Sequence, residues 1–352
     1  MGADPSSALL RLKVVYLLSV FPLLGGCGDG GSATGPDDPP DAPVPCLIGL
    51  PQCEERVPVG TALFQPVFRT HPIQTGDTSV VRAVIVVHGA DRNPDAYFDR
   101  MVKAVSMAGL IPTTLVVSPH FQTADDGPGV GEPVWTSGGW KRGHLSVSGI
   151  GNGERISSYE AVDDILAYLG NRVLFPKLES IVVTGHSAGG QYAHRFAATS
   201  PAAESLSHLR FRYVVANPST YLYLGPERHS IDGTFQIPDR QACPGYNEWH
   251  YGLEGRNSYA SRLTEEGIQD RLVSRDVIYM LGTADTGEEA LDMTCGAMLQ
   301  GQHRYARGLT LHQYMDTFYP ASDHELVEVV GVGHSSTRMY QSPQGRQVLF
   351  SW

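Results

Sequence analysis

The segment from residue 181 to residue 199 constrains the fold more than any other part of the chain. An apolar, β-branched run over residues 181–184 leads into GHSAG (residues 185–189) and then into the helical pattern of residues 191–199. This order predicts a buried parallel strand that turns sharply into a helix. The small residues around Ser187 let the backbone approach closely at the turn. We therefore expect the Ser187 hydroxyl to stand above the edge of a sheet.

Apolar runs and helical patterns alternate from about residue 80 to the end of the chain. This alternation predicts the α/β class, with a mostly parallel central sheet flanked by helices. The expected strands are residues 82–87, 114–118, 181–184, 213–216, 277–281 and 326–330. The expected helices are residues 98–108, 157–171, 191–199 and 344–350.

Two segments interrupt this alternation. Residues 122–152 are rich in glycine and contain Trp140, which predicts a long loop near the carboxyl edge of the sheet. Residues 218–275 carry many aromatic side chains, including Tyr246 and Trp249, between two expected core strands. Ordinary connections in α/β folds have only about two to six residues. We expect this second segment to be an inserted cap with short helices.

The N-terminus has the pattern of an export signal. Arg11 and Lys13 precede an apolar run over residues 14–24, which is shorter than an ordinary membrane span. The run ends in LGGC (residues 24–27), which resembles a bacterial lipobox. The resemblance implies that residues 1–27 are a lipoprotein signal peptide and that Cys27 is lipidated. A plain signal peptide cut nearby is the alternative.

The residues after the leader predict a flexible tether over residues 28–60, followed by one catalytic domain over residues 61–352. Up to Pro45 the tether consists almost entirely of small and polar residues and proline. By resemblance, Gly28 in place of an aspartate favours the outer membrane or cell surface, with the periplasm as the alternative. The formal net charge of −11 argues against binding to nucleic acid.

Four cysteines remain once Cys27 is set aside, and an even number in an exported chain predicts two disulfides. Three pairings are possible. Proximity favours Cys46 with Cys53, which leaves Cys243 with Cys295. No cysteine or histidine spacing matches a zinc site, so we expect no metal.

An acid and a histidine follow Ser187 at the ends of later strands. Asp285 comes just after residues 277–281, and His334 follows residues 326–330. A serine needs a base to take its proton, and the base needs an acid to orient it. Ser187, His334 and Asp285 therefore form the expected catalytic triad. The rival candidates are Asp292 for the acid and His303, His312 and His324 for the base, and we expect a structural role for His186.

Two backbone N–H groups are needed to stabilise the oxyanion that forms on a reacting carbonyl. The N–H of Ala188, directly after the nucleophile, is the first candidate. The second is the N–H of Ala90, in the loop that begins with His88 and Gly89, with Asp91 as the fallback. We expect His88 to brace this loop.

These motifs resemble those of the α/β-hydrolase superfamily, in particular its secreted serine esterases of the polyester-depolymerase and feruloyl-esterase type. The resemblance covers roughly residues 80–350 and implies an α/β-hydrolase fold. It also implies cleavage of carboxylic esters, small or polymeric, by a Ser187 acyl-enzyme without a cofactor, and contact with a membrane only through the lipid. An aromatic cap suits a hydrophobic substrate, so Trp249, Tyr246 and Trp140 are candidate substrate contacts, although packing in the cap is the alternative. A peptidase or amidase on the same triad, and a non-catalytic surface-binding lipoprotein, are the alternative functions.

Overall fold

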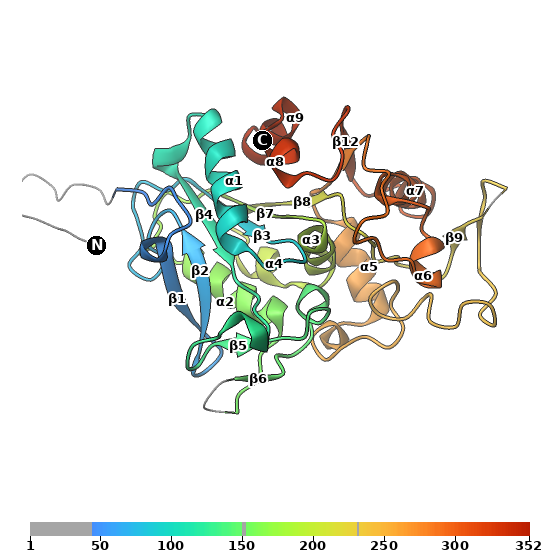
Figure 1. Cartoon of the computed structure of the whole chain (residues 1–352), viewed down its shortest axis with the longest axis horizontal. Coiled ribbons are helices and arrows are strands. Elements are labelled where there is room, and N and C mark those ends of the chain that lie inside the picture. The colour runs from blue at the N-terminus through green and yellow to red at the C-terminus, as the bar shows by residue number, and fades with distance from the viewer. Residues whose placement is uncertain (1–43, 150–152, 231) are drawn as a thin grey trace, which may run out of the picture. The chain divides into compact units, whose positions relative to one another are not determined.

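An eight-stranded sheet lies at the centre of the computed structural model (Figure 1). The structure describes residues 44–149, 153–230 and 232–352, so the expected signal peptide, Cys27 and the first part of the tether lie outside it. The strands are β1 (Glu54–Val59), β2 (Leu63–Arg69), β3 (Arg82–Val87), β4 (Thr114–Pro119), β7 (Ser180–His186), β8 (Arg210–Ala216), β11 (Val277–Gly282) and β12 (Glu325–Val329).

The strand order is β1-β2-β4-β3-β7-β8-β11-β12. The pairs β1/β2 and β2/β4 are antiparallel, and every later pair is parallel. Two small ribbons lie outside the sheet, β5 (Pro133–Val134) with β6 (Ser148–Gly149) and β9 (Arg228–His229) with β10 (Phe235–Gln236). The expected mostly parallel sheet is confirmed, with an antiparallel hairpin added at one edge.

Helices cover both faces of the sheet (Figure 1). The α-helices are α1 (Pro94–Met107), α2 (Ser158–Leu169), α3 (Ala188–Thr199), α4 (Ala202–Ser205), α5 (Glu265–Val273), α6 (Cys295–Met298), α7 (Arg304–Phe318), α8 (Ser336–Gln341) and α9 (Pro343–Phe350). Short 3₁₀ turns are η1 (Pro51–Cys53), η2 (Ile111–Thr113), η3 (Ala124–Asp126), η4 (Trp140–Arg142) and η5 (Ala260–Arg262). None of the described helices is long and apolar enough to span a membrane.

The alternation of side chains along each strand divides the core into two layers. In β3, Ala83, Ile85 and Val87 pack with residues of α2, α3, α5 and α7. Val84 and Val86 point to the other face and pack with α1, α8 and α9. Because both faces are covered, the central strands are apolar throughout, which is why the sequence shows them so clearly.

Two expected boundaries are corrected. The tether was placed up to residue 60, but Glu54–Val59 pairs with β2 as an edge strand, so the folded domain begins earlier. The cap was placed up to residue 275, but α5 contacts α3 and is the crossover helix between β8 and β11. The insertion is therefore the segment from residue 217 to residue 264. It contains the β9/β10 ribbon and η5 rather than several helices.

Disulfides join Cys46 to Cys53 and Cys243 to Cys295. This is the pairing that the spacing favours. The second bridge ties the insertion to the first residue of α6, in the segment that follows β11.

Candidate active site

Ser187 occupies a strained turn between β7 and α3. Its φ is 61° and its ψ is −117°, a conformation that costs a residue with a side chain about 1–3 kcal/mol. The turn is held because the Ser187 N–H donates to the Ala216 carbonyl at 3.0 Å. A Cβ atom on Gly185 would lie 2.2 Å from the Gly189 carbonyl carbon, and one on Gly189 would lie 2.2 Å from the Val87 carbonyl oxygen. Only glycine fits these two positions.

Asp285 and His334 meet at the carboxyl ends of β11 and β12. The His334 Nδ1 and Asp285 Oδ2 atoms lie 2.7 Å apart, and the Asp285 side chain is only 1% exposed. Oδ1 of Asp285 lies 3.7 Å from Nη1 of Arg304, whose side chain is also 1% exposed. A buried carboxylate therefore fixes the imidazole of His334, and a buried guanidinium faces that carboxylate.

Ser187 and His334 line the same cavity, which has a volume of about 380 Å³. No hydrogen bond joins their side chains in the described part of the chain, and such bonds are often loose before a substrate binds. His186 lies beside them, with its ring centroid 4.4 Å from that of His334. Burial holds the pKa of His186 well below its usual value, so this second imidazole stays neutral.

Of the described residues, His186, Asp285 and His334 form a group with the spacing of metal ligands, their ligand atoms lying within 4.8 Å of one another. However, Nδ1 of His334 and Oδ2 of Asp285 are already joined by the 2.7 Å hydrogen bond. The Asp285 carboxylate and the His334 imidazole therefore form a hydrogen-bonded pair.

The loop after β3 is braced by His88. The Phe121 N–H donates to Nε2 of His88 at 3.0 Å, so Nδ1 carries the proton and donates to the Gly89 carbonyl at 2.9 Å. Burial lowers the pKa of His88 to about 3, which keeps this imidazole neutral. Ala90 follows and lines the cavity. The structure places Ala188 at the first position of α3, directly after Ser187.

The rival acid and bases lie elsewhere. Asp292 accepts a hydrogen bond from the Tyr251 hydroxyl at 2.7 Å. His303, His312 and His324 do not line the cavity that holds Ser187.

The three expected substrate contacts are not in this cavity either. Trp140 is fully buried, with its ring 4.6 Å from that of His88. Tyr246 is also fully buried. Trp249 is partly exposed and donates its indole N–H to the Arg142 carbonyl at 3.0 Å. The structure therefore assigns Trp140 and Tyr246 to packing, because their rings fill the interior of the loop and of the insertion.

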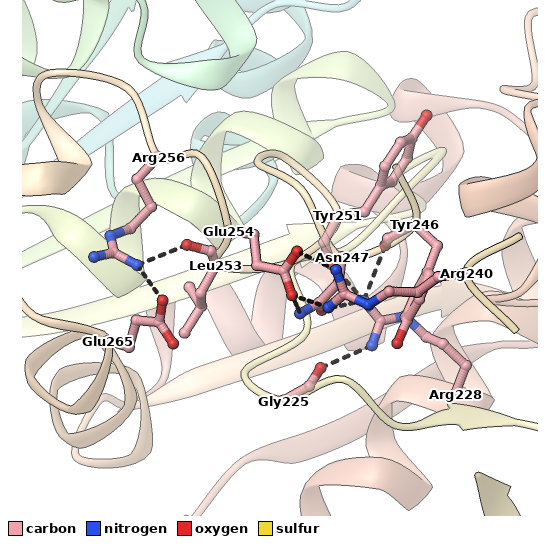
Figure 2. Close-up of polar contacts among 10 residues, drawn as sticks. All are labelled: Gly225, Arg228, Arg240, Tyr246, Asn247, Tyr251, Leu253, Glu254, Arg256 and Glu265. Carbon is pink, nitrogen blue, oxygen red and sulfur yellow. Dashed lines mark hydrogen bonds and ion pairs between the residues drawn. The ribbon is translucent and has the colours of Figure 1, made fainter. Parts of the chain in front are cut away.

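Arg228 organises the insertion around Tyr246, as Figure 2 shows. Its guanidinium is buried and donates to the carbonyls of Gly225, Tyr246 and Tyr251 and to Oδ1 of Asn247. Its guanidinium carbon also lies 5.1 Å from the centre of the Tyr246 ring. Together with the Glu227 carbonyl, one cation thus satisfies five acceptors in a segment with little regular structure.

Two residues of α1 line the cavity and were not predicted. The Arg100 guanidinium donates to the Ser336 hydroxyl at 3.1 Å and lies over the Tyr97 ring at 4.9 Å. Burial raises the pKa of Tyr97 to about 12, so its hydroxyl keeps its proton. The sequence could have indicated Tyr97 and Arg100, because they are three residues apart, and so on one face, of a helix that directly follows the His88 loop.

By sequence, the chain matches no protein-family model and no curated protein. Poly(aspartic acid) hydrolase-1 from Sphingomonas sp. KT-1 is similar in structure, with a TM-score of 0.59, 23% identity, and coverage of 84% of this chain and 97% of that one. LpqC, a poly(3-hydroxybutyrate) depolymerase from Bordetella parapertussis, has a TM-score of 0.59 and 24% identity over 84% and 90% of the two chains. This chain has the α/β-hydrolase fold. The predicted fold class is thereby confirmed, and the likeness at this identity concerns the fold.

Proposed function

We propose that this chain is a serine hydrolase that cleaves carboxylic esters through a covalent acyl-enzyme on Ser187. The observation that carries the proposal is the placement of Ser187, at a strained strand-to-helix turn, in one cavity with His334, which is itself bonded to the buried Asp285. This is the constellation that activates a serine hydroxyl in α/β-hydrolases.

In the proposed first step, Ser187 Oγ attacks the ester carbonyl carbon while Nε2 of His334 takes the hydroxyl proton. The carbonyl oxygen becomes an oxyanion, for which the N–H groups of Ala188 and Ala90 are the proposed donors. Each such donor is typically worth about 3–4 kcal/mol in the transition state. When the intermediate collapses, the bond to the alcohol oxygen breaks and His334 returns the proton to that oxygen.

In the second step, water attacks the acyl-enzyme and passes a proton to His334. Collapse of this intermediate releases the carboxylic acid and returns the proton to Ser187 Oγ. Asp285 keeps its charge in both steps, orients the imidazole and stabilises the imidazolium. These steps draw on side chains and water, and require no cofactor.

The names of the two structural neighbours favour a polymeric substrate, since one is a poly(3-hydroxybutyrate) depolymerase and the other a poly(aspartic acid) hydrolase. We propose an ester substrate, either a small molecule or a polymer chain end. An amidase would use the same triad, so matched p-nitrophenyl ester and p-nitroanilide substrates with one acyl group separate the two activities.

The expected lipid on Cys27 remains part of the proposal, which makes the protein an exported lipoprotein. The disulfides support a location outside the cytoplasm, where such bonds form and persist.

Ser187→Ala tests the proposal. We expect turnover of p-nitrophenyl esters to fall by at least about 10⁴-fold and labelling by a fluorophosphonate probe to disappear, with an unchanged thermal melt. Ser106→Ala, on the exposed side of α1, is the matched control and should behave like the wild type. Undiminished ester turnover by Ser187→Ala would refute the assignment.

A further inference from the structure

Arg100 brings a permanent positive charge into the cavity that holds Ser187. A guanidinium keeps its proton at every working pH. Among the described residues that line this cavity, Arg100 is the only lysine or arginine. The second imidazole of the lining, His186, is held neutral by its burial, which lowers its pKa. The cavity therefore contains one fixed cation that no step of the proposed hydrolysis uses.

The contacts of this guanidinium are with neutral groups. Nη1 of Arg100 donates to the Ser336 hydroxyl at 3.1 Å, and the guanidinium carbon lies 4.9 Å from the centre of the Tyr97 ring. Within residues 44–149, 153–230 and 232–352, no carboxylate lies within ion-pair distance of it. A guanidinium has five N–H donors, so most of those of Arg100 remain available to a ligand. The residue is only partly exposed, and a half-buried cation is stabilised when an anion pairs with it.

Two contacts fix Arg100 beside the catalytic groups. Its hydrogen-bond partner, Ser336, is the first residue of α8 and follows His334 by two positions. Its ring partner, Tyr97, reaches the loop after β3, since a Cβ atom on Gly89 would lie 2.7 Å from the Tyr97 hydroxyl oxygen. That loop carries the proposed oxyanion donor. Arg100 is therefore tied to the turn that holds the catalytic base and, through Tyr97, to the oxyanion loop.

Two carboxylates, Asp91 and Glu289, also line the cavity. Both residues are exposed, so water and salt screen their charges. The half-buried guanidinium, in contrast, can contact a bound anion directly through charge-assisted hydrogen bonds. The two exposed charges should weaken the binding of an anion without preventing it, and they should disfavour a ligand with a second negative charge.

We propose that Arg100 binds a free carboxylate of the substrate, so that the enzyme prefers esters with a carboxylate a few bonds from the scissile carbonyl. This inference rests on the proposed ester hydrolysis at Ser187. The planar guanidinium matches the two oxygens of a carboxylate. A cavity of about 380 Å³ has room for a small molecule only, so the carboxylate and the scissile ester must lie close together.

Two kinds of ester have this chemistry. The carboxylate can belong to the acyl side, as in monoesters of short dicarboxylic acids, or to the alcohol side, as in acyl esters of short hydroxy acids. Short oligomers of a polyester of hydroxy acids are of the second kind, because each ends in a free carboxylate. The interior of such a polymer has no carboxylate near its ester bonds. The enzyme should therefore act on oligomers and chain ends faster than on the interior of an intact polymer.

A specificity ratio tests this preference. Monoethyl succinate, adipate and suberate are compared with ethyl butanoate, hexanoate and octanoate, in which a methyl group replaces the carboxylate. For the alcohol side, O-acetyl γ-hydroxybutyrate and O-acetyl ε-hydroxycaproate are compared with butyl and hexyl acetate. Titration of the released acid gives kcat/KM for each ester. The ratio of carboxylate to neutral ester should fall about tenfold to 100-fold in Arg100→Gln in at least one series, as expected for a lost hydrogen bond to a charged group.

Lys103→Gln is the matched control, because Lys103 is exposed one turn further along α1 and does not line the cavity. It should keep the wild-type ratio. Arg100→Lys keeps the charge without the planar fork and should recover part of the ratio. Glu289→Gln removes an opposing charge and should raise the ratio about twofold, a gain that misfolding cannot produce. A wild-type ratio for Arg100→Gln in both series, including an equal loss on carboxylate and neutral esters, would overturn the proposal.

A binding measurement separates this inference from the proposed function. Monoethyl adipate and O-acetyl γ-hydroxybutyrate are each titrated by calorimetry into Ser187→Ala, alone and combined with Arg100→Gln or Lys103→Gln. The Arg100 change should weaken the binding of at least one ligand about tenfold, and the Lys103 change should not. Equal binding of both ligands by all three proteins would overturn the assignment. If the wild type cleaves no ester and takes no fluorophosphonate label, the proposed function fails, and these titrations still decide whether Arg100 holds a carboxylate.

Discussion

Replacing Arg304 with methionine removes the buried positive charge that faces Asp285. The two charged groups lie 3.7 Å apart. At this distance and an effective dielectric constant of about 20, unit charges attract by about 4 kcal/mol. Removing one partner of a buried pair typically costs about 3–5 kcal/mol, because the other charge stays buried. Arg304→Met should therefore lower the free energy of unfolding by about 4 kcal/mol.

The same change should affect catalysis, because Asp285 orients His334. A displacement of about 1 Å in a catalytic group can cost about 100-fold in rate, so we expect kcat to fall by about 10-fold to 100-fold.

Urea unfolding and kcat with a p-nitrophenyl ester measure both effects. Arg304→Lys keeps the charge and should lie between Arg304→Met and the wild type, while Arg172→Met controls for the loss of an exposed arginine. An Arg304→Met variant with wild-type stability and wild-type kcat would show that Arg304 does not support Asp285.

Three further outcomes are expected. Replacing Cys243 and Cys295 together by serine should lower the free energy of unfolding by about 4 kcal/mol, which is the chain-entropy value for a sequence separation of 52. Urea titrations of the oxidised wild type and of the variant measure this difference in stability. Burial raises the pKa of Asp163 to about 7, so the folded chain holds a proton that the unfolded chain releases above about pH 4. The free energy of unfolding should therefore fall as the pH rises from about 4 to 7. Urea titrations at several pH values should find that this fall is absent in Asp163→Asn. Cys27→Ser should move the protein from the membrane to the soluble fraction of a bacterial host, and unchanged partitioning would contradict lipidation.

The sequence predicts the central strands because their burial on both faces leaves long apolar runs, as in β3. The hairpin of β1 and β2 was missed because Pro58 and Pro66 interrupt its strands. Proline is tolerated there because Pro58 lies in the edge strand β1 and because β4 pairs only with residues 67–69 of β2, beyond Pro66. The helix α7 was missed for a different reason. Its buried side includes Arg304 and Arg307, so its sequence lacks the apolar stripe by which a helix is usually identified.

The candidate triad could be predicted because each of its members follows a clear strand. The supporting residues could not be predicted in the same way. Arg304 lies within the helix α7, and its importance comes from the buried Asp285 carboxylate that faces it, which depends on the packing of distant segments. The aromatic residues of the insertion show the converse, since Tyr246 serves as a platform for Arg228 and not as an exposed contact.

The insertion is fastened at several separate points. The Cys243–Cys295 bridge joins it to the segment after β11, the Arg142 carbonyl accepts hydrogen bonds from two of its side chains, and Tyr259 is hydrogen-bonded to Asp163 of α2. A swinging lid needs a segment with few such ties, because its opening must cost little free energy. The insertion should therefore stay in place during turnover. The enzyme should then show no interfacial activation, and its rate on a sparingly soluble ester should rise smoothly through the solubility limit without a lag or a jump.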